Sequence, residues 1–244
     1  MKLLIIRHGD PDYVKDSLTE KGWREAELLS RKISKMEVTH FYVSSLGRAK
    51  DTASLTLEKM GRTATECKWL REFWPAIRRP DLEGERRSIA WDWLPQDWMA
   101  EKAFYQPDQW ADTDIMREAG AGEAYREVIQ NFDQLLADHG YVRDGSLYRA
   151  ERPNRDTLAL FCHFGMECVL LSHLTNISPM ILWHHFCAAP SSVTTVYTEE
   201  RRQGKAIFRV SAFGDISHLY AEGEEPSFAA RFCETYDEEK ERHK

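Results

Sequence analysis

Arginine and histidine side chains follow apolar runs at three places in this sequence. Arg7-His8-Gly9 follows the first run, Arg48 comes shortly after the second, and the third ends at His163. A guanidinium group is a planar fork of donors that matches phosphate or carboxylate, and a neighbouring imidazole can act as a base or a nucleophile. Two such forks around a histidine would bind a dianion such as a phosphoryl group. We therefore expect an anion-handling site, provided that the three places lie together.

The apolar runs are typical of buried strands in a parallel sheet. Residues 3–6 are four large apolar side chains, two of them β-branched, and residues 40–46 and 156–163 have a similar character. In an open α/β sheet the carboxyl ends of parallel strands face the ligand crevice, so adjacent strands would deliver their final residues to one edge. Gly9 would let the backbone turn sharply and a ligand approach closely.

Helical periodicity alternates with these strands. Thr19 is a suitable N-cap for a helix over residues 19–35, on which Trp23 and Leu29 would be buried, and a second helix would end at Gly61. This rhythm predicts an α/β fold, a three-layer α/β/α sandwich with a mostly parallel central sheet. Further helices are expected over 122–139, 165–174 and 179–187, strands over 63–70, 191–198 and 206–213, a polar surface loop over 142–155 and a polar tail helix over 227–244.

Residues 73–122 break the rhythm of strands and helices. This segment holds five tryptophans and four prolines among many charged residues. A structureless loop of that length would be unusual inside a compact domain, so we interpret it as an inserted helical lid in a single domain over residues 1–244. The tryptophans could form a core or a hydrophobic wall for the substrate.

Composition narrows the class of protein. The hydrophobic content of 42%, the charged content of 30% and the length of 244 residues are those of an ordinary globular protein. A net charge of −7 argues against a nucleic-acid or membrane partner, and no apolar run is long enough to span a membrane. Five cysteines without regular spacing indicate reduced thiols, so we expect a cytoplasmic location.

The motifs, in this order and spacing, resemble the histidine phosphatase superfamily, which includes phosphoglycerate mutases and many phosphomonoesterases. Arg7-His8-Gly9 matches the defining N-terminal motif of that family, and His163 matches its second histidine. The resemblance covers nearly the whole chain. It also includes the helix start at residues 18–22, the motif at residues 44–49 with Arg48, the acidic position Glu72, the helix start at Gly122-Glu123 and the pattern Ser217-His218-Leu219.

The resemblance implies a double displacement on a small phosphorylated metabolite. His8 would attack phosphorus to give a phosphohistidine, which water then hydrolyses, and Glu72 would serve as the general acid and base. Arg7, Arg48 and His163 would neutralise the phosphoryl charge, so that neither a metal nor a cofactor is required. A phosphoglycerate-mutase-type phosphotransferase is the alternative activity, and a non-catalytic protein that binds a phosphorylated ligand is a more distant one.

Two features leave the details of the site open. The family often has Glu or Gln and then Ser or Thr after the first glycine, whereas this chain has Asp10-Pro11, which bears on substrate contacts near the nucleophile. Asp10 also lies close to His8 in sequence and therefore competes with Glu72 for the acid role. Phe164-Gly165 stands where two small residues usually follow the second histidine, which would narrow the pocket. The adjacent residues His184-His185 suggest packing rather than a metal site, and the arginine pair at residues 78–79 suggests a solvated face more than a substrate contact.

Overall fold

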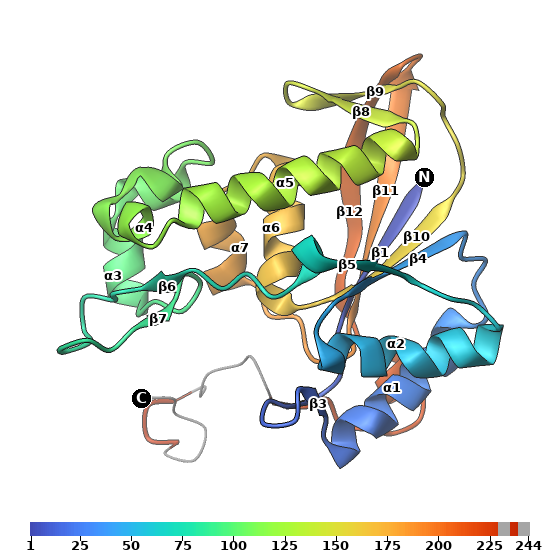
Figure 1. The fold of residues 1–244 in the computed structure, drawn as a ribbon, viewed down its shortest axis with the longest axis horizontal. Coiled ribbons are helices and arrows are strands. Elements are labelled where there is room, and N and C mark those ends of the chain that lie inside the picture. Colours follow the sequence, from blue (N-terminus) through green and yellow to red (C-terminus); the bar gives the residue numbers. More distant parts are fainter. Residues whose placement is uncertain (229–234, 239–244) are drawn as a thin grey trace.

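An eight-stranded sheet forms the centre of the molecule (Figure 1). The computed structural model describes residues 1–228 and 235–238. The predicted α/β sandwich is confirmed. In spatial order the strands are β5 (Thr65–Cys67), β4 (His40–Ser44), β10 (Thr157–Cys162), β1 (Lys2–Arg7), β11 (Val193–Arg202), β12 (Lys205–Asp215), β9 (Leu147–Ala150) and β8 (Tyr141–Asp144).

The parallel strands gather in one half of the sheet. β5, β4, β10 and β1 are neighbours that all run in the same direction, as expected for the three apolar runs. Arg7 is opposite Cys162, and Ser44 is opposite Cys67, so these strands end at a common edge. This edge receives the residues that follow each strand.

The other half of the sheet is antiparallel. β11 pairs with the far side of β1, and β12, β9 and β8 follow in turn. The polar loop expected over residues 142–155 is wrong, because β8 and β9 form a hairpin there. Tyr148 and Ala150 alternate with exposed residues on β9 and are buried, and the strand completes the sheet by pairing with β12.

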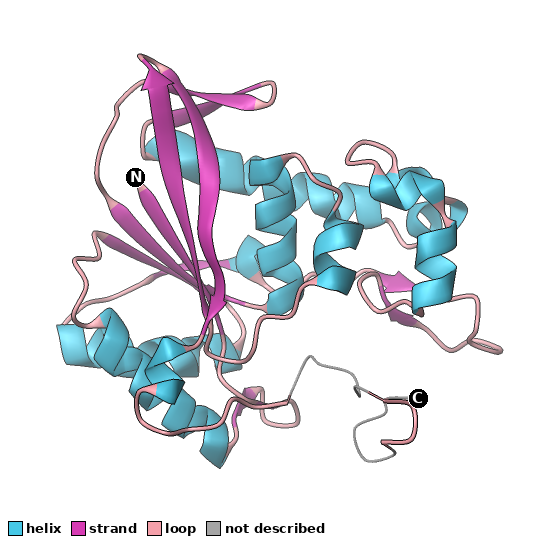
Figure 2. Cartoon of the chain, turned by 180° about the vertical axis from the view of Figure 1, so that it is seen from behind, coloured by secondary structure: helices cyan, strands magenta, loops and turns pink. Residues whose placement is uncertain are grey.

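Helices cover both faces of the sheet, as Figure 2 shows from behind. On one face α1 (Glu20–Ile33) and α2 (Gly47–Met60) pack against Leu4, Ile6 and Phe161. On the other face α5 (Ala121–Asp138), α6 (Phe164–Thr175) and α7 (Pro179–His185) pack over Leu3 and Ile5. Consecutive residues of β1 thus point into opposite cores, which explains its unbroken apolar sequence.

The two helices that flank the site begin and end much as their sequences predict. The hydroxyl of Thr19 accepts a hydrogen bond from the Gly22 amide at 3.0 Å and caps α1. Gly61 ends α2 in the left-handed conformation, with φ of 60°. Trp23 is an exception, because it is 38% exposed rather than buried.

Residues 73–122 form a mixed segment between the 3-10 helix η1 (Lys68–Leu70) and α5. Trp93, Trp98 and Trp110 are buried in the core that also contains α5, α6 and α7, whereas Trp74 is 60% exposed. The segment contains β6 (Ala76–Ile77), β7 (Ser88–Ile89), α3 (Pro95–Ala100), η2 (Lys102–Tyr105), η3 (Trp110–Asp112) and α4 (Asp114–Glu118).

Three short elements and the chain end complete the fold. β2 (Pro11–Asp12) and β3 (Ser17–Leu18) form a small hairpin after β1, and α8 (Ser217–Tyr220) follows β12 and contacts α1. The tail helix expected over residues 227–244 falls largely outside the described residues. Within the described part, no helix is long and apolar enough to cross a membrane, and four cysteines are free thiols.

Candidate active site

Four of the residues singled out in the sequence come together at the carboxyl edge of the parallel strands. Arg7 is the last residue of β1 and His8 follows it, His163 follows β10, and Arg48 lies in the first turn of α2 behind β4. Their exposed fractions are 3%, 2%, 0% and 7%. The ring centroids of His8 and His163 are 5.1 Å apart. The edge therefore concentrates two guanidinium groups and two imidazoles in a space shielded from water.

The hydrogen bonds of His8 fix its tautomer. Nδ1 lies 2.7 Å from the carbonyl oxygen of Gly9, which can only accept, so Nδ1 carries the proton. Nε2 faces the Nε–H of Arg48 at 3.4 Å and is the acceptor there. The lone pair of Nε2 thus points toward Arg48, where an anion bound by this arginine would lie within reach of the ring nitrogen.

The surroundings of His8 keep it neutral. Burial lowers its pKa well below the usual value, and the positive charges of Arg7 and Arg48 lower it further. The hydrogen bond to Gly9 opposes this shift without cancelling it. A neutral ring is the nucleophilic form, and the charges that suppress its protonation are also those that would bind an anion.

Arg48 is held in place by an acid that the sequence analysis did not single out. Its NH1 group forms an ion pair with Oδ1 of Asp16 at 2.6 Å, and the Gly47 amide donates to Oδ2 of the same carboxylate at 2.7 Å. A Cβ on Gly47 would lie 2.0 Å from the carbonyl oxygen of Asp16, so only glycine permits this approach. Asp16 itself has φ of 49°, in a loop whose sequence gives no sign of this role.

Arg7 is fixed by the loop that precedes β11. Its NH1 group donates to the carbonyl of Ala188 at 2.5 Å, and the amide of Ser191 donates to the carbonyl of His8 at 3.0 Å. His218, from the family pattern near the chain end, contacts the Ser191 hydroxyl through Nε2 at 3.0 Å. It therefore supports the loop behind the site and makes no described contact with the four central residues.

His163 has one free ring nitrogen. Nε2 lies 2.8 Å from the hydroxyl of Ser44, while Nδ1 is buried and has no hydrogen-bond partner in the described part of the chain. When the Ser44 hydroxyl donates to Nε2, the proton sits on Nδ1 and leaves a buried N–H without an acceptor. A phosphoryl oxygen is a suitable partner for such a donor.

Glu72 lies at the boundary between this site and a neighbouring cavity. Its Oε1 accepts hydrogen bonds from the amides of Phe73 at 2.9 Å and Met166 at 3.0 Å, and the side chain lines the cavity. Burial raises the pKa of the carboxyl, against the lowering effects of the Phe73 amide, Arg7, Arg48 and the Met166 amide. An acid with a raised pKa is suited to proton transfer near neutral pH.

The sequence Phe164-Gly165 shapes the wall beside Glu72. A Cβ on Gly165 would lie 2.5 Å from Nε1 of Trp91 and 2.7 Å from Oε1 of Glu72. The Arg7 guanidinium lies over the Phe164 ring, 5.8 Å from its centroid. The large residue after His163 therefore contacts Arg7, and Gly165 makes room for the Glu72 carboxyl.

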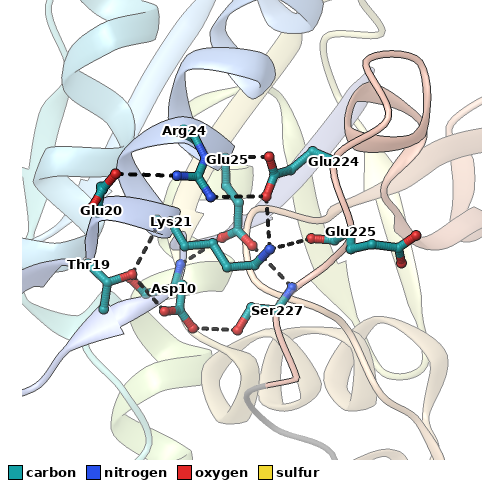
Figure 3. A network of polar contacts seen from close by, with 10 residues as sticks. Asp10, Thr19, Glu20, Lys21, Arg24, Glu25, Glu224, Glu225 and Ser227 are labelled. Atoms are coloured by element: carbon teal, nitrogen blue, oxygen red, sulfur yellow. Dashed lines mark hydrogen bonds and ion pairs between the residues drawn. The ribbon is translucent and has the colours of Figure 1, made fainter.

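The carboxylate of Asp10, the competing acid, is engaged elsewhere. Figure 3 shows it between the hydroxyls of Thr19 and Ser227, of which Thr19 donates at 2.7 Å. The Asp10 amide donates to the buried carboxylate of Glu25 at 2.8 Å, and that carboxylate also accepts from the amide of Ser227. Asp10 thus joins the start of α1 to the segment after α8.

Gly9 contributes through its backbone. Its carbonyl orients His8, and its amide donates to the hydroxyl of Thr52 at 2.9 Å. A Cβ here would lie 2.8 Å from the carbonyl of Gly22 on α1, so close packing of the chain is the reason for this glycine. Gly9 has no positive φ, and the sharp turn expected from the sequence is therefore not what requires it.

One group of side chains in the described part could hold a metal ion, and it lies away from this site. The donor atoms of His40, His139 and Asp156 lie within 4.8 Å of one another near the amino ends of β4 and β10. His184 and His185 both contact the ring of Trp98, in agreement with the packing role expected for them.

The comparisons with known proteins agree with one another. Residues 3–209 match the sequence profile of the histidine phosphatase superfamily (branch 1). The chain is 28% identical over 152 residues to the probable phosphoglycerate mutase GpmB of Serratia proteamaculans (strain 568), which covers 57% of this chain and 70% of the relative.

Solved structures share the fold at lower sequence identity. A mutant phosphoserine phosphatase from Entamoeba histolytica in complex with phosphoserine has a TM-score of 0.56 and 18% identity, covering 89% of this chain and 98% of that one. A mycobacterial glucosyl-3-phosphoglycerate phosphatase, in complex with VO3, has a TM-score of 0.56 and 18% identity, covering 87% and 98%. Since the profile spans most of the sequence, the chain belongs to branch 1 of the histidine phosphatase superfamily.

Proposed function

We propose that this protein is a phosphomonoesterase that hydrolyses a small phosphorylated metabolite through a phosphohistidine on His8. The observation that carries this proposal is the state of the His8 ring. Its Nδ1 proton is committed to Gly9, and its Nε2 lone pair faces Arg48. A neutral imidazole aimed into a cationic site is prepared to attack phosphorus.

In the first step Nε2 of His8 forms a bond to phosphorus while the bond from phosphorus to the ester oxygen breaks. Glu72 gives its proton to the departing alkoxide. Arg7 and Arg48 neutralise the equatorial oxygens, and Nδ1–H of His163 donates to one of them. The buried position of these groups strengthens each interaction, because little water screens them.

In the second step water replaces the alcohol. Glu72, now ionised, takes a proton from water, the oxygen of which attacks phosphorus as the bond to Nε2 breaks. Inorganic phosphate leaves, and His8 and Glu72 return to their starting protonation states. Glu72 lines the cavity beside the site, so both the alcohol and the water have a route to it.

Two residues of the insertion support a lid role for residues 73–122. The Phe73 amide binds Glu72, and the Trp91 indole, which lies beside Gly165, donates to the Phe73 carbonyl at 2.9 Å. We infer that the insertion closes one side of the site and holds the acid.

Three buried cysteines, Cys67, Cys162 and Cys168, are free thiols. Free thiols suit the reducing cytoplasm, which we propose as the location of the protein.

The test is to trap the phosphoenzyme. With a good substrate the native protein should yield acid-labile, base-stable phosphate on His8, and His8→Ala should abolish turnover while the protein stays folded. His40→Ala, a change of an exposed histidine near the opposite end of β4, serves as the control and should keep full activity. Label on a serine or on Cys162 would rule out this mechanism.

A phosphoglycerate mutase activity is the second candidate, and the similarity to the probable mutase GpmB favours it. A mutase must protect its phosphohistidine from water, whereas Lys68, Arg71 and Trp74 in the cavity beside Glu72 are exposed. We therefore favour hydrolysis. Incubation with 3-phosphoglycerate, with and without 2,3-bisphosphoglycerate, separates the two, since a mutase yields 2-phosphoglycerate and a phosphatase yields phosphate.

A further inference from the structure

A cavity opens next to the proposed acid Glu72 and is also lined by Ser45, which follows β4. It has a volume of about 530 Å³ and is bounded by η1, the first residues of the insertion and α5. Glu72 and Met166 are the lining residues that connect it with the buried site. An ester whose phosphoryl group sits between Arg7 and Arg48 would place its leaving group here, because Glu72 must reach the departing oxygen.

Two cationic side chains line this cavity, Lys68 and Arg71. Both are exposed, and within residues 1–228 and 235–238 neither forms an ion pair. Other basic residues nearby are already paired: Lys50 binds Glu66 at 2.6 Å, and Arg79 is buried between Asp81 and Asp92. Lys68 and Arg71 thus keep their donors available for a ligand.

The charge of Arg71 already reaches the phosphoryl site. The pKa of His163 is lowered mainly by burial, then by His8, Arg48 and Arg7, and Arg71 adds to the same effect. Two acids, Glu72 and Glu127, also line the cavity, and Oε1 of Glu72 already accepts hydrogen bonds from the amides of Phe73 and Met166. Lys68 and Arg71, which have no ion-pair partner in the described part, are therefore the groups that can bind a negative group of the ligand.

The cavity also has an aromatic and apolar wall. Trp74 is 60% exposed and lies next to Phe73, with Trp69, Val128 and Met166 on the lining as well. A large exposed indole beside cations can cover the apolar body of a ligand whose charged end meets the cations. Of the five insertion tryptophans from which the sequence suggested a wall, Trp74 lines this cavity, whereas the tryptophans at 93, 98 and 110 belong to the core. Trp69, on η1 before the insertion, lines the cavity as well.

We propose that this cavity is a second anion subsite, and that the substrate is a phosphomonoester whose leaving group carries a carboxylate or another anion. Lys68 and Arg71 would bind that anion, and Trp74 would cover the carbon skeleton between the two charges. This inference rests on the proposed function for its geometry. It adds a substrate class, and it assigns specificity to Lys68 and Arg71, to which the sequence analysis gave no role.

A matched set of aryl esters tests the charge requirement. Phenyl phosphate has no second group, 4-carboxyphenyl phosphate carries the anion, and 4-carbamoylphenyl phosphate is its neutral counterpart of similar shape. The amide is the better leaving group, so leaving-group chemistry alone favours it over the carboxylate. The native enzyme should nevertheless have a kcat/KM about tenfold higher for the carboxylate, mainly through KM, given two exposed charge contacts.

The variants identify the side chains. The measure is the ratio of kcat/KM for 4-carboxyphenyl phosphate to kcat/KM for 4-carbamoylphenyl phosphate. This ratio should fall about two- to fivefold in Lys68→Gln and in Arg71→Gln, and the double variant should have no preference for the carboxylate. Trp74→Ala should weaken both aryl esters alike, since it removes a contact to the ring. Arg78→Gln changes an exposed arginine that does not line the cavity, so the ratio should stay as in the native enzyme.

A binding measurement keeps the result independent of turnover. Calorimetric titration of the His8→Ala protein with the same esters reports affinity without reaction. If His8→Ala binds the carboxylate ester and the amide ester equally well, and the further change Arg71→Gln alters neither affinity, the subsite is overturned even if the native enzyme hydrolyses phenyl phosphate. A preference for the carboxylate that disappears in the double variant supports the subsite even if no ester is hydrolysed, in which case the proposed hydrolysis fails alone.

Discussion

Burial shifts the pKa values of His8 and Glu72, the residues that we propose as nucleophile and acid, in opposite directions. The pKa of His8 is lowered, which favours a neutral nucleophile, and the pKa of Glu72 is raised, which favours a proton donor. When the pKa values of two groups are shifted apart in this way, one group can act as the nucleophile and the other as the acid near neutral pH.

The proton-transfer role of Glu72 predicts a dependence on the leaving group. p-Nitrophenolate leaves easily without a proton, whereas an alkoxide does not. Glu72→Gln should therefore slow phosphorylation by an alkyl phosphate about a hundredfold or more, and by p-nitrophenyl phosphate much less. Arg48→Ala should slow both alike, because both transition states carry the same phosphoryl charge. Single-turnover rates are the measurement; equal losses in Glu72→Gln, with the unequal pattern in Asp10→Asn, would move the acid role to Asp10.

Gly165 offers a test of how closely Glu72 must be placed. A methyl group there would meet Trp91 Nε1 and Glu72 Oε1, and both atoms are held by hydrogen bonds to Phe73 or Met166. Gly165→Ala should shift the carboxyl and lower kcat for an alkyl ester by about tenfold or more. Gly61→Ala is the comparison: it strains a left-handed cap with open space around it, so it should lower stability by about 1 kcal/mol and leave kcat intact.

The central residues of the site could be predicted from the sequence, because each follows a strand whose apolar character is unmistakable. Asp16, Ser44 and Ser191 could not be assigned roles in the same way. Asp16 and Ser191 have φ of 49° and 61° in loops, where only the folded chain determines what a side chain or amide meets. The strand predicted over 63–70 is confirmed at Thr65–Cys67, but a 3-10 helix begins at Lys68 and a bend follows at Arg71. The orientation of these two side chains could therefore not be predicted from a strand pattern.

At the scale of elements, the site depends on how α2 meets the β2–β3 hairpin. The carboxylate of Asp16, between the hairpin strands, binds both the first amide of α2 and the Arg48 side chain. This contact ties the start of α2 to the hairpin that follows β1. The helix that carries Arg48 is thereby fixed from outside the sheet.

Loss of this contact should affect catalysis more than folding. Asp16→Asn keeps the shape but weakens the hold on Arg48, so kcat/KM should fall about tenfold, since a misplaced charge stabilises the transition state less. The affinity for vanadate should fall in parallel, and the melting temperature should change little. Asp12→Asn is the control in the same hairpin, because the Asp12 carboxylate contacts Lys15 and the Val14 amide but not Arg48, and it should change none of these. An unaltered vanadate affinity in Asp16→Asn would contradict the positioning role.

Elements were predictable where periodicity was strong. The caps at Thr19 and Gly61 and the boundaries of α1 and α2 agree closely with the pattern. The β8–β9 hairpin was missed because its strands are short and polar, and because only pairing with β12 buries Tyr148 and Ala150. Edge strands of this kind are specified by their neighbours more than by their own composition.

At the scale of the whole molecule, buried acids predict how stability depends on pH. Glu167 is fully buried on α6, and burial raises its pKa to about 7 against the opposing effects of the Thr194 hydroxyl and Arg7. Since the folded pKa lies above the unfolded value of 4.5, the folded state binds the proton more tightly. The resulting stability is complete below that unfolded value and is lost as pH rises through about 7.

The size of this effect can be measured by urea unfolding. Between pH 5.5 and 8.5 the free energy of unfolding of the native protein should fall by about 2 kcal/mol because of Glu167. Buried Glu25, whose pKa is also about 7, should contribute a similar decrease. Glu167→Gln should remove about that amount of the loss. Glu151→Gln, at an exposed position, should not, and a native protein that grows more stable over this range would contradict the prediction.

The position of β1 between β10 and β11 has a consequence for synthesis on the ribosome. Lys2 lies opposite Thr157 on one side and Tyr197 on the other, so β1 is synthesised long before either of the strands that flank it. A truncated product that ends before β10 therefore lacks the strand to which the His8 amide donates a hydrogen bond. Such long-range pairing also slows folding. Until β10 and β11 have been synthesised, the apolar strand β1 stays exposed and is a segment that a chaperone would protect from aggregation.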